Sequence, residues 1–481
     1  MKFILAILIL VSTNLYAQDF FQRTYGGTGS EFGRGVVQTG DGGYACVGAT
    51  NSYADGSSNV YLIKLDELGN YVWGRNIGGI GTIEWGMDII EDSEGNLVIA
   101  GYTNNTENSD YDGLIIKLSG AGEIIWQKKF GSDDWDFFES LDLDSEDAIY
   151  AVGNSFRDGS QQGWIVKVNQ NGDEIWEETL TGSGKIYLTG VSVCDDENIS
   201  YVGYSENLIS SSNSFLSGII SENSTLKWVR TEDEWGNIIV NDCECHNNVI
   251  YSIGTVFSED ASNFYLAKQE VEFGNSLLNS PLLDSPLSFY AESIDITPSG
   301  NLVLAGAGEF IFFEGLDAFI IKRNDDGNYI SSDFNDTFGQ PGYDYFYDVS
   351  VTTDGGYIAV GTTNSFENSE QLYLAKIASD GQVSSTNEDF LDLATPTRNK
   401  NPEQGISLYP NPTLNRTKIE TSRKIESLLL SNSNGQILWQ KMNITTNPES
   451  LDLSGFVSGI YILRIESSDG SVSHHKVIKS Q

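Results

Sequence analysis

The stretch Leu97-Val98-Ile99-Ala100-Gly101 is one of seven similar segments, each a short aliphatic or aromatic run that ends in glycine. The other six lie at 44–48, 149–153, 199–203, 250–254, 302–306 and 357–361. The closing glycines, spaced 50 to 55 residues apart, are Gly48, Gly101, Gly153, Gly203, Gly254, Gly306 and Gly361. Such a fixed period indicates a repeat architecture in which each repeat is one supersecondary unit.

Two further marks recur in phase with these glycines. Six repeats contain an apolar run that ends in lysine, at Lys64, Lys117, Lys167, Lys268, Lys322 and Lys376. Four repeats are followed by a tryptophan, at Trp73, Trp126, Trp176 and Trp228. Glycine-rich turns separate the runs, and no segment shows a long apolar period of 3.6 residues, so the chain is predicted to be all-β. Seven repeats of four strands predict a seven-bladed β-propeller over residues 18–383, with a β-solenoid as the minor alternative.

The two ends of the repeat region complement each other. The segment Phe21-Gln22-Arg23-Thr24-Tyr25-Gly26 has the same form as Trp126-Gln127-Lys128-Lys129-Phe130-Gly131, which we interpret as the fourth strand of a blade. No repeat precedes the first segment, and the seventh repeat ends without such a strand. We therefore expect the residues near Asp19–Tyr25 to complete the last blade, because ring closure removes an exposed sheet edge.

The N-terminus predicts export. Lys2 precedes an apolar run at 3–11, and a small residue, Ala17, follows at a distance suited to signal peptidase. Residues 1–17 are therefore predicted to be a signal peptide, with a retained anchor as the alternative. No other segment approaches 18 apolar residues, so no transmembrane segment is expected in the mature chain.

Composition excludes several classes of function. The chain has 27 Lys and Arg against 68 Asp and Glu, a net charge of -41, so a nucleic-acid partner is not expected. Only three histidines are present, and His246 is the only one among the repeats, which argues against a His-rich zinc site and a Ser-His-Asp triad. A bridge from Cys194 to Cys243 or Cys245 and free buried thiols both remain open.

The pattern changes after the repeats. Residues 384–404 dilute any core with proline and charged residues and are predicted to form a flexible linker. Alternating strands then predict a small β-sandwich at 405–481. This segment contains, in order, Tyr409-Pro410-Asn411-Pro412, Gly459-Ile460-Tyr461 and Lys476-Val477-Ile478.

This ordered set of motifs resembles the type A C-terminal sorting domain of the type IX secretion system. The resemblance implies a bacterium of the Bacteroidota type, Sec export, and passage through the outer-membrane translocon. It implies the secretion machinery and its sortase as partners, and cargo that is either attached to surface lipopolysaccharide or released. The expected location is therefore outside the cell or on its outer surface.

Acid–aromatic pairs are the candidate site of the propeller. Counting back seventeen residues from each repeat glycine gives Glu31, Glu84, Asp136, Ile186, Asn237, Phe289 and Asp344. In four repeats that are neighbours around a closed ring, this residue is an acid followed by an aromatic: Glu31 and Phe32, Glu84 and Trp85, Asp136 and Phe137, Asp344 and Tyr345. We expect these pairs to form a half-ring at one mouth of the channel.

The chemistry of these pairs allows two interpretations. Aromatic faces stack on sugars, and carboxylates bind hydroxyls or gather Ca²⁺, the one cofactor that the sequence leaves possible. Alternatively, the aromatic side chains pack between blades and the acids accept hydrogen bonds from neighbouring backbone amides. A repeat would produce the same recurrence in either case.

The sequence thus favours a secreted or cell-surface, non-catalytic propeller that binds a glycan, a protein or a cation through its loop face. Recognition would involve the variable loops at 49–60, 102–112, 154–163, 204–214, 255–263, 307–317 and 362–371. The alternatives are a carbohydrate-active enzyme, a glycoside hydrolase or lyase with paired carboxylates, and an adhesive or structural envelope protein. An enzyme should present convergent carboxylates of shifted pKa, whereas a binding protein should present a shallow, repeated surface.

Overall fold

The computed structural model describes two compact units, which divide after Asp392. In the first unit it describes residues 20–382, except 53–57, 80, 106–109, 208–211, 259–260, 283–286, 310–314, 330–334, 340–341 and 366–368, and also 387–388. In the second it describes residues 406–479, except 410–415, 422–423, 433–436, 443–448, 457–458 and 468–471. The predicted signal peptide, most of the predicted linker and several loop tips lie outside these residues. No helix that could cross a membrane occurs in the described part of the chain.

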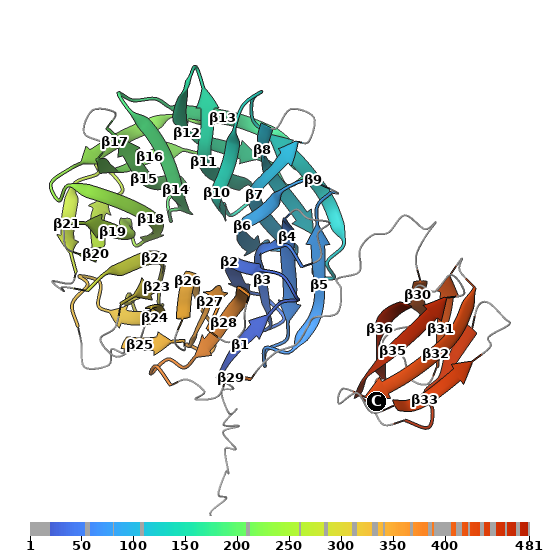
Figure 1. Cartoon of the computed structure of the whole chain (residues 1–481). Helices are drawn as coiled ribbons and strands as arrows, with labels where there is room; N and C mark the ends of the chain where they lie inside the picture. The colour runs from blue at the N-terminus through green and yellow to red at the C-terminus, as the bar shows by residue number, and fades with distance from the viewer. Residues whose placement is uncertain are drawn as a thin grey trace, which may run out of the picture. The chain divides into compact units, whose positions relative to one another are not determined.

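The first unit is a seven-bladed β-propeller, as predicted, with β2, β6, β10, β14, β18, β22 and β26 nearest the ring axis (Figure 1). Blade 1 contains β2 (Glu31–Gln38), β3 (Tyr44–Thr50), β4 (Asn59–Leu65) and β5 (Tyr71–Ile77). Blade 2 contains β6 (Glu84–Glu91), β7 (Leu97–Asn105), β8 (Asp110–Leu118) and β9 (Ile124–Phe130). Blade 3 contains β10 (Asp136–Leu143), β11 (Ile149–Arg157), β12 (Ser160–Val168) and β13 (Glu174–Leu180). Blades 4 and 5 are β14 (Lys185–Val193), β15 (Asn198–Glu206), β16 (Asn213–Ser221) and β17 (Leu226–Glu232); and β18 (Asn237–His246), β19 (Val249–Phe257), β20 (Ser262–Glu270) and β21 (Ser276–Pro281).

Blades 6 and 7 complete the ring. Blade 6 is β22 (Phe289–Ile296), β23 (Leu302–Gly308), β24 (Gly315–Arg323) and β25 (Asn335–Phe338). Blade 7 contains β26 (Gly342–Val351), β27 (Tyr357–Thr363) and β28 (Gln371–Ile377). Its outermost strand is β1 (Phe21–Tyr25), which pairs antiparallel to β28 from Phe21 opposite Lys376 to Tyr25 opposite Leu372. The predicted closure by the N-terminal segment is therefore confirmed. The short β29 (Asn387–Glu388) pairs with β1 on its other edge.

The repeat glycine lies where the innermost strand approaches the second strand most closely. A Cβ atom on Gly101 would lie 1.9 Å from the carbonyl oxygen of Trp85, and one on Gly48 would lie 1.7 Å from that of Phe32. Any side chain would therefore push the two strands apart. This close approach explains why the sequence repeats a glycine at this position after an otherwise apolar strand.

The trailing tryptophans join each blade to the next at the rim. Trp126 donates its indole N–H to the carbonyl oxygen of Gln170 at 3.0 Å, in the outer hairpin of blade 3. Trp176 and Trp228 make the same bond to blades 4 and 5, each at 2.8 Å. In blade 7, Phe21 takes this position and packs against Gly69 of blade 1.

Five of the six recurrent lysines are buried and paired with acids, whereas Lys322 is half-buried and approaches the carbonyl oxygen of Ser379. Lys117 and Asp92 are 2.8 Å apart, and Lys376 and Asp354 are 2.9 Å apart. Similar pairs join Lys64 to Asp41, Lys167 to Asp144, and Lys268 to Asp325 and Asp326. A buried ammonium group requires such a partner, because an unpaired charge in the interior is costly.

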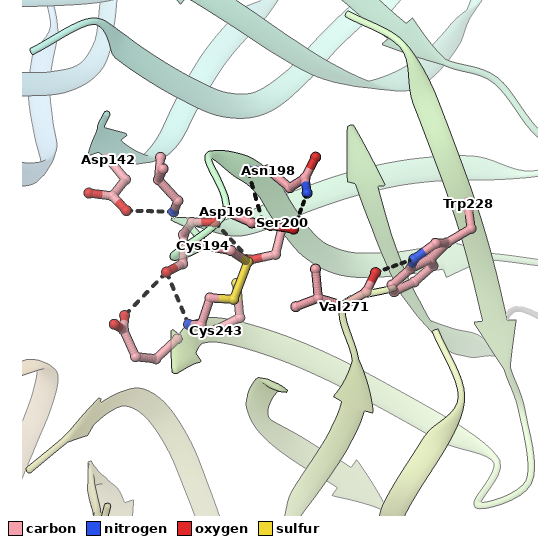
Figure 2. Close-up of a disulfide and its surroundings, with 12 residues drawn as sticks. Asp142, Cys194, Asp196, Asn198, Ser200, Trp228, Cys243 and Val271 are labelled. Atoms are coloured by element: carbon pink, nitrogen blue, oxygen red, sulfur yellow. Dashed lines mark hydrogen bonds between the residues drawn. A yellow bond between two sulfur atoms is a disulfide. The ribbon is translucent and has the colours of Figure 1, made fainter. Parts of the chain in front are cut away.

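Blade 4 lacks this ion pair and has a disulfide instead (Figure 2). Ile219 pairs with Trp228 where Lys117 pairs with Trp126, so it occupies the lysine position. Cys194 begins the same hairpin turn that Asp92 begins in blade 2, and it is bonded to Cys245 of blade 5. Of the two bridges that the sequence left open, the structure has this one; Cys243 and Cys46 are free and buried.

The C-terminal unit consists of two antiparallel sheets. One contains β30 (Ile406–Tyr409), β31 (Arg416–Thr421) and β34 (Glu449–Asp452); the other contains β32 (Ile425–Asn432), β33 (Ile437–Met442), β35 (Gly459–Ser467) and β36 (Val472–Lys479). Tyr461 is buried in the core, Gly459 begins β35, and the backbone of Lys476 pairs with Ile462. Tyr409 ends β30, whereas Pro410, Asn411 and Pro412 lie outside the described residues.

Removal of residues 18–26 tests ring closure. The deletion exposes an edge of blade 7 and the pockets that Phe21 and Tyr25 fill, since both side chains are buried. We expect the melting temperature of the full-length protein to fall by about 10 °C or more. A synthetic peptide of residues 18–26 added in trans should restore part of the loss. An unchanged melting curve would contradict closure by β1.

Reduction tests the bridge between blades 4 and 5. The denatured, unreduced protein should titrate two thiols, and the free energy of unfolding should fall by about 2–4 kcal/mol on reduction. The double variant Cys194→Ala, Cys245→Ala should be less stable to a similar degree and insensitive to reductant, which controls for other effects of the reagent. Four thiols before reduction would show that the bridge does not form.

Candidate functional site

The four predicted acids are buried within their own blades. Glu31, Glu84, Asp136 and Asp344 have exposed fractions of 0%, 5%, 0% and 0%. Each lies opposite a hydroxyl residue at the end of the second strand: Thr50, Thr103, Ser155 and Thr363. The structure therefore places these acids out of reach of a ligand and corrects the expected half-ring of carboxylates.

Their hydrogen bonds show what these acids do. Glu31 accepts hydrogen bonds from the hydroxyl of Thr50 at 2.7 Å and from the amide of Gly27 at 2.8 Å. Asp136 accepts one from the amide of Ser132 at 2.5 Å. Both acids thus fix the segment that leads into the innermost strand. Their side chains accept these bonds from within the fold, as the packing interpretation of the sequence expected.

The aromatic partners, in contrast, are half-buried and join side chains of neighbouring blades. The ring of Phe32 stacks on Trp85 with 5.1 Å between centroids, and Trp85 lies parallel to Tyr102 at 6.3 Å. Tyr102 meets Phe137 at 5.0 Å. Phe137 continues to Tyr111 at 5.3 Å, and Tyr111 meets Trp135 at 6.0 Å.

We call these six residues, Phe32, Trp85, Tyr102, Phe137, Tyr111 and Trp135, the aromatic strip. It crosses blades 1 to 3 where the innermost strands β2, β6 and β10 begin. The loops that connect the second and third strands of each blade lie at this same end. Trp135, with 52% of its surface exposed, is its most accessible described member. Three of the four predicted aromatic residues belong to the strip, and Tyr345 of blade 7 lies outside it.

A β-bulge in each innermost strand supplies a second set of residues. The pairing register shifts at the same level in all seven blades, and the unpaired residues are Arg34, Met87, Glu139, Thr189, Asn241, Glu292 and Tyr347. Arg34 of blade 1 interacts electrostatically with Glu139 of blade 3 and Glu292 of blade 6, so these side chains lie around the ring axis. Bulges commonly re-aim a side chain in this way.

Arg34 connects this axial level to the aromatic strip. Its guanidinium carbon lies 4.0 Å from the ring centroid of Tyr347 and 5.4 Å from that of Trp85. Tyr345 lies 4.7 Å from Tyr347 and donates its hydroxyl to Glu292 at 2.5 Å. We call Arg34, Glu139, Glu292 and Tyr347 the axial cluster. Sequence reasoning missed all four. Each lies fourteen residues before a repeat glycine, but the sequence does not show that a bulge at this position turns the side chain toward the axis.

Below the axial cluster, carboxylates link successive innermost strands. Each accepts a hydrogen bond from a backbone amide of the next blade, at 2.6 to 3.0 Å: Asp88 from Leu141, Asp142 from Val193, Asp242 from Ile294, Asp295 from Val351, and Asp348 from Val36. We call these five residues the carboxylate belt. Figure 2 shows the bond at Asp142 beside the disulfide. The belt joins blades, as backbone amides would otherwise be unpaired near the axis.

Burial shifts the titration of these carboxyls. Removal from water raises the pKa of Asp88 to about 8, of Asp242 to about 7, and of Asp142 and Asp295 to about 6. Burial also raises the pKa of Glu139 and Glu292 to about 7, although the nearby Arg34 opposes the shift. Convergent carboxyls of raised pKa therefore do occur, but the hydrogen bonds of the belt give five of them a structural role.

The predicted Ca²⁺ chemistry finds no cluster of ligands. In the described ranges, no group of three or more His, Cys, Asp or Glu side chains is arranged to hold a metal ion. Asp325 and Asp326, in an acidic turn of blade 6, bind Lys268 instead. The tips of six variable loops, including 106–109 and 208–211, lie outside the described residues.

Comparison with known proteins identifies the C-terminal unit. Residues 407–480 match the family model described as a secretion system C-terminal sorting domain. The protein is therefore a cargo of the type IX secretion system, secreted or displayed on the cell surface, that carries a β-propeller. Its sorting domain implies interaction with the type IX machinery. No curated protein matches the chain.

Several solved structures resemble the chain at low identity. They include the Pan2 WD40 domain of Neurospora crassa, with 9% identity, 74% of this chain and 92% of that chain covered, and a TM-score of 0.44. A protein of unknown function from Dyadobacter fermentans is 9% identical, with 74% of this chain and 97% of that chain covered and a TM-score of 0.46. An ulvan lyase solved with a bound saccharide is 9% identical, with 74% of this chain and 96% of that chain covered and a TM-score of 0.49. At this similarity none of them bears on the ligand or activity.

The raised carboxyl pKa values predict how stability depends on pH. Because the folded pKa lies above the ordinary value near 4, the folded state binds more protons than the unfolded chain between about pH 4 and pH 8. Stability should therefore fall as the pH rises through this window, and we expect a melting temperature about 5 °C higher at pH 5 than at pH 8. Asp88→Asn should reduce the difference. A melting temperature that is constant or increases with pH would contradict the assignment.

Proposed function

We propose that the propeller binds a glycan, and that the chain of sugars lies along the aromatic strip. The observation that carries this proposal is the continuity of the strip, in which six half-buried or exposed rings follow one another across three blades. Sugar rings bind to aromatic faces because C–H groups pack on the π-surface while hydroxyls remain hydrogen-bonded.

The length of the strip supports a chain of several sugars in place of a single one. Its successive centroids are separated by 5.0 to 6.3 Å, and the path has five such steps from Phe32 to Trp135. Polar groups that could orient the sugars lie beside it, including Arg34 above Trp85 and the hydroxyls of Tyr102 and Tyr111. Few well-placed polar groups beside apolar walls are typical of ligand sites.

The address of the protein agrees with this proposal. A secreted or surface-displayed cargo meets extracellular polysaccharides, and the sorting domain brings the propeller to that side of the outer membrane. We further propose that the sortase removes the sorting domain and that the propeller is then attached to surface lipopolysaccharide or released. Attachment would give many propellers on one surface and hence avidity.

A carbohydrate-active enzyme is the second candidate. It is favoured by Glu139 and Glu292, which lie in the axial cluster and whose pKa values burial raises to about 7, as a general acid requires. Incubation of any bound oligosaccharide with the protein, followed by analysis of chain length, separates the two functions. A glycan-binding protein leaves the chains intact, and Glu139→Gln should then leave affinity for neutral chains within about twofold.

Replacement of Trp135 tests the strip. Trp135→Ala removes an exposed ring and should weaken binding of oligosaccharide hits from a glycan array about tenfold, measured by calorimetry. Trp235→Ala is the matched control, because Trp235 is 42% exposed and precedes the innermost strand of blade 5 as Trp135 precedes that of blade 3. Equal effects of the two variants, or no binding to any glycan with or without Ca²⁺, would contradict the proposal.

A further inference from the structure

Among the described residues, Arg34 is a cation that makes no hydrogen bond or ion pair with a polar group. It lies at the bulge of β2, half-buried, with its guanidinium over the ring of Tyr347 at 4.0 Å. Its Nε atom is buried and has no hydrogen-bond partner in the described structure. A guanidinium has five N–H donors, and leaving buried donors unpaired costs free energy.

The other arginines of the described propeller all donate hydrogen bonds to oxygen atoms. Arg157 binds Glu177 with two bonds, Arg75 donates to Gly122, and Arg230 donates to Phe273. Arg23 and Arg323 donate to the oxygens of Asn70 and Lys322. Acids outnumber bases by 68 to 27 in the chain, so partners are abundant. Among the described residues, an arginine without such a partner is therefore unusual, and Arg34 lies beside the strip, 5.4 Å from the ring of Trp85.

The nearest acids do not satisfy Arg34. Glu139 and Glu292 influence it electrostatically, but neither forms an ion pair with it among the described residues. Glu292 instead accepts a hydrogen bond from the hydroxyl of Tyr345. The ring of Tyr347 packs against the guanidinium of Arg34 at 4.0 Å and gives its Nε–H no hydrogen-bond acceptor, so a planar, two-oxygen acceptor is the kind of partner that would satisfy it.

We propose that Arg34 binds one carboxylate or sulfate group of the glycan and so selects chains that carry isolated anionic groups. This inference rests on the proposed glycan-binding function and adds the class of ligand. Arg34 is the single cation of the axial cluster, so the cluster can pair with a single anionic group. The net charge of -41 repels densely charged polymers, which restricts the ligand to sparsely charged chains.

Pairs of oligosaccharides that differ by one anionic group test this inference. Xylopentaose is compared with the same chain bearing one glucuronic acid, and neoagarohexaose with the same chain bearing one sulfate, by calorimetry on the full-length protein. These two arms distinguish a carboxylate from a sulfate. We expect the protein to bind the charged member of at least one pair about tenfold more tightly than the neutral member.

Variants of Arg34 assign the preference to this residue. Arg34→Gln should abolish the preference, so that the charged and the neutral chain bind with equal affinity. Arg34→Lys keeps the charge but loses the planar fork, so it should retain only part of the preference. Arg230→Gln is the control, because it removes the same charge from the outer strand of blade 4. Melting curves identify a variant that fails to fold, and Arg34→Lys then decides the result.

The outcomes separate the inference from the function beneath it. If charged and neutral chains bind equally, or if the preference survives Arg34→Gln, the inference is overturned while glycan binding stands. If Trp135→Ala weakens only neutral chains, charged chains bind elsewhere and the inference also fails. If no oligosaccharide binds the native protein, the proposed function and the inference fail together.

Discussion

Closure of the ring is the constraint on which every other feature of the propeller depends. The fourth strand of blade 7 is β1, which comes from the opposite end of the repeat region and pairs with β28 over five residues. Closure gives blade 1 a neighbour on both sides. Phe21 of blade 7 packs on Gly69 of blade 1 at the rim, and Asp348 accepts a hydrogen bond from the backbone amide of Val36 at the axis. Without it, blades 1 and 7 would each present an open face to water.

The same closure assembles the candidate site. Arg34, Glu139, Glu292 and Tyr347 come from blades 1, 3, 6 and 7, and they meet only because the innermost strands surround one axis. The carboxylate belt below them explains much of the acidity near the axis, because its members accept hydrogen bonds from backbone amides of the next blade. The acidic residues of the belt are therefore structural, and Arg34 is the arginine of the described propeller that has no such partner, which is why we propose that it binds a ligand.

The sequence predicted the fold far better than the site. A repeat glycine, a lysine and a tryptophan in phase predicted seven blades, and the form of the segment at 21–26 predicted the closing strand. The count of seventeen residues failed in the fifth repeat, where the β18–β19 hairpin is one residue shorter: Gly254 pairs with Val240, so Ile238 and not Asn237 matches Glu31. The axial cluster was hidden for another reason. Its members all lie fourteen residues before a repeat glycine, but their residue type changes from blade to blade, and the sequence does not show that a bulge turns this position toward the axis.

The nine tryptophans of the chain allow a direct test that the aromatic strip is the ligand site. In protein labelled with 5-fluorotryptophan, fluorine NMR reports each indole, assigned by single Trp→Phe variants. The account predicts that a bound oligosaccharide shifts the resonances of Trp85 and Trp135, which belong to the strip, and leaves those of Trp126, Trp176 and Trp228, which join blades at the rim, unchanged. Shifts confined to the rim tryptophans would contradict it.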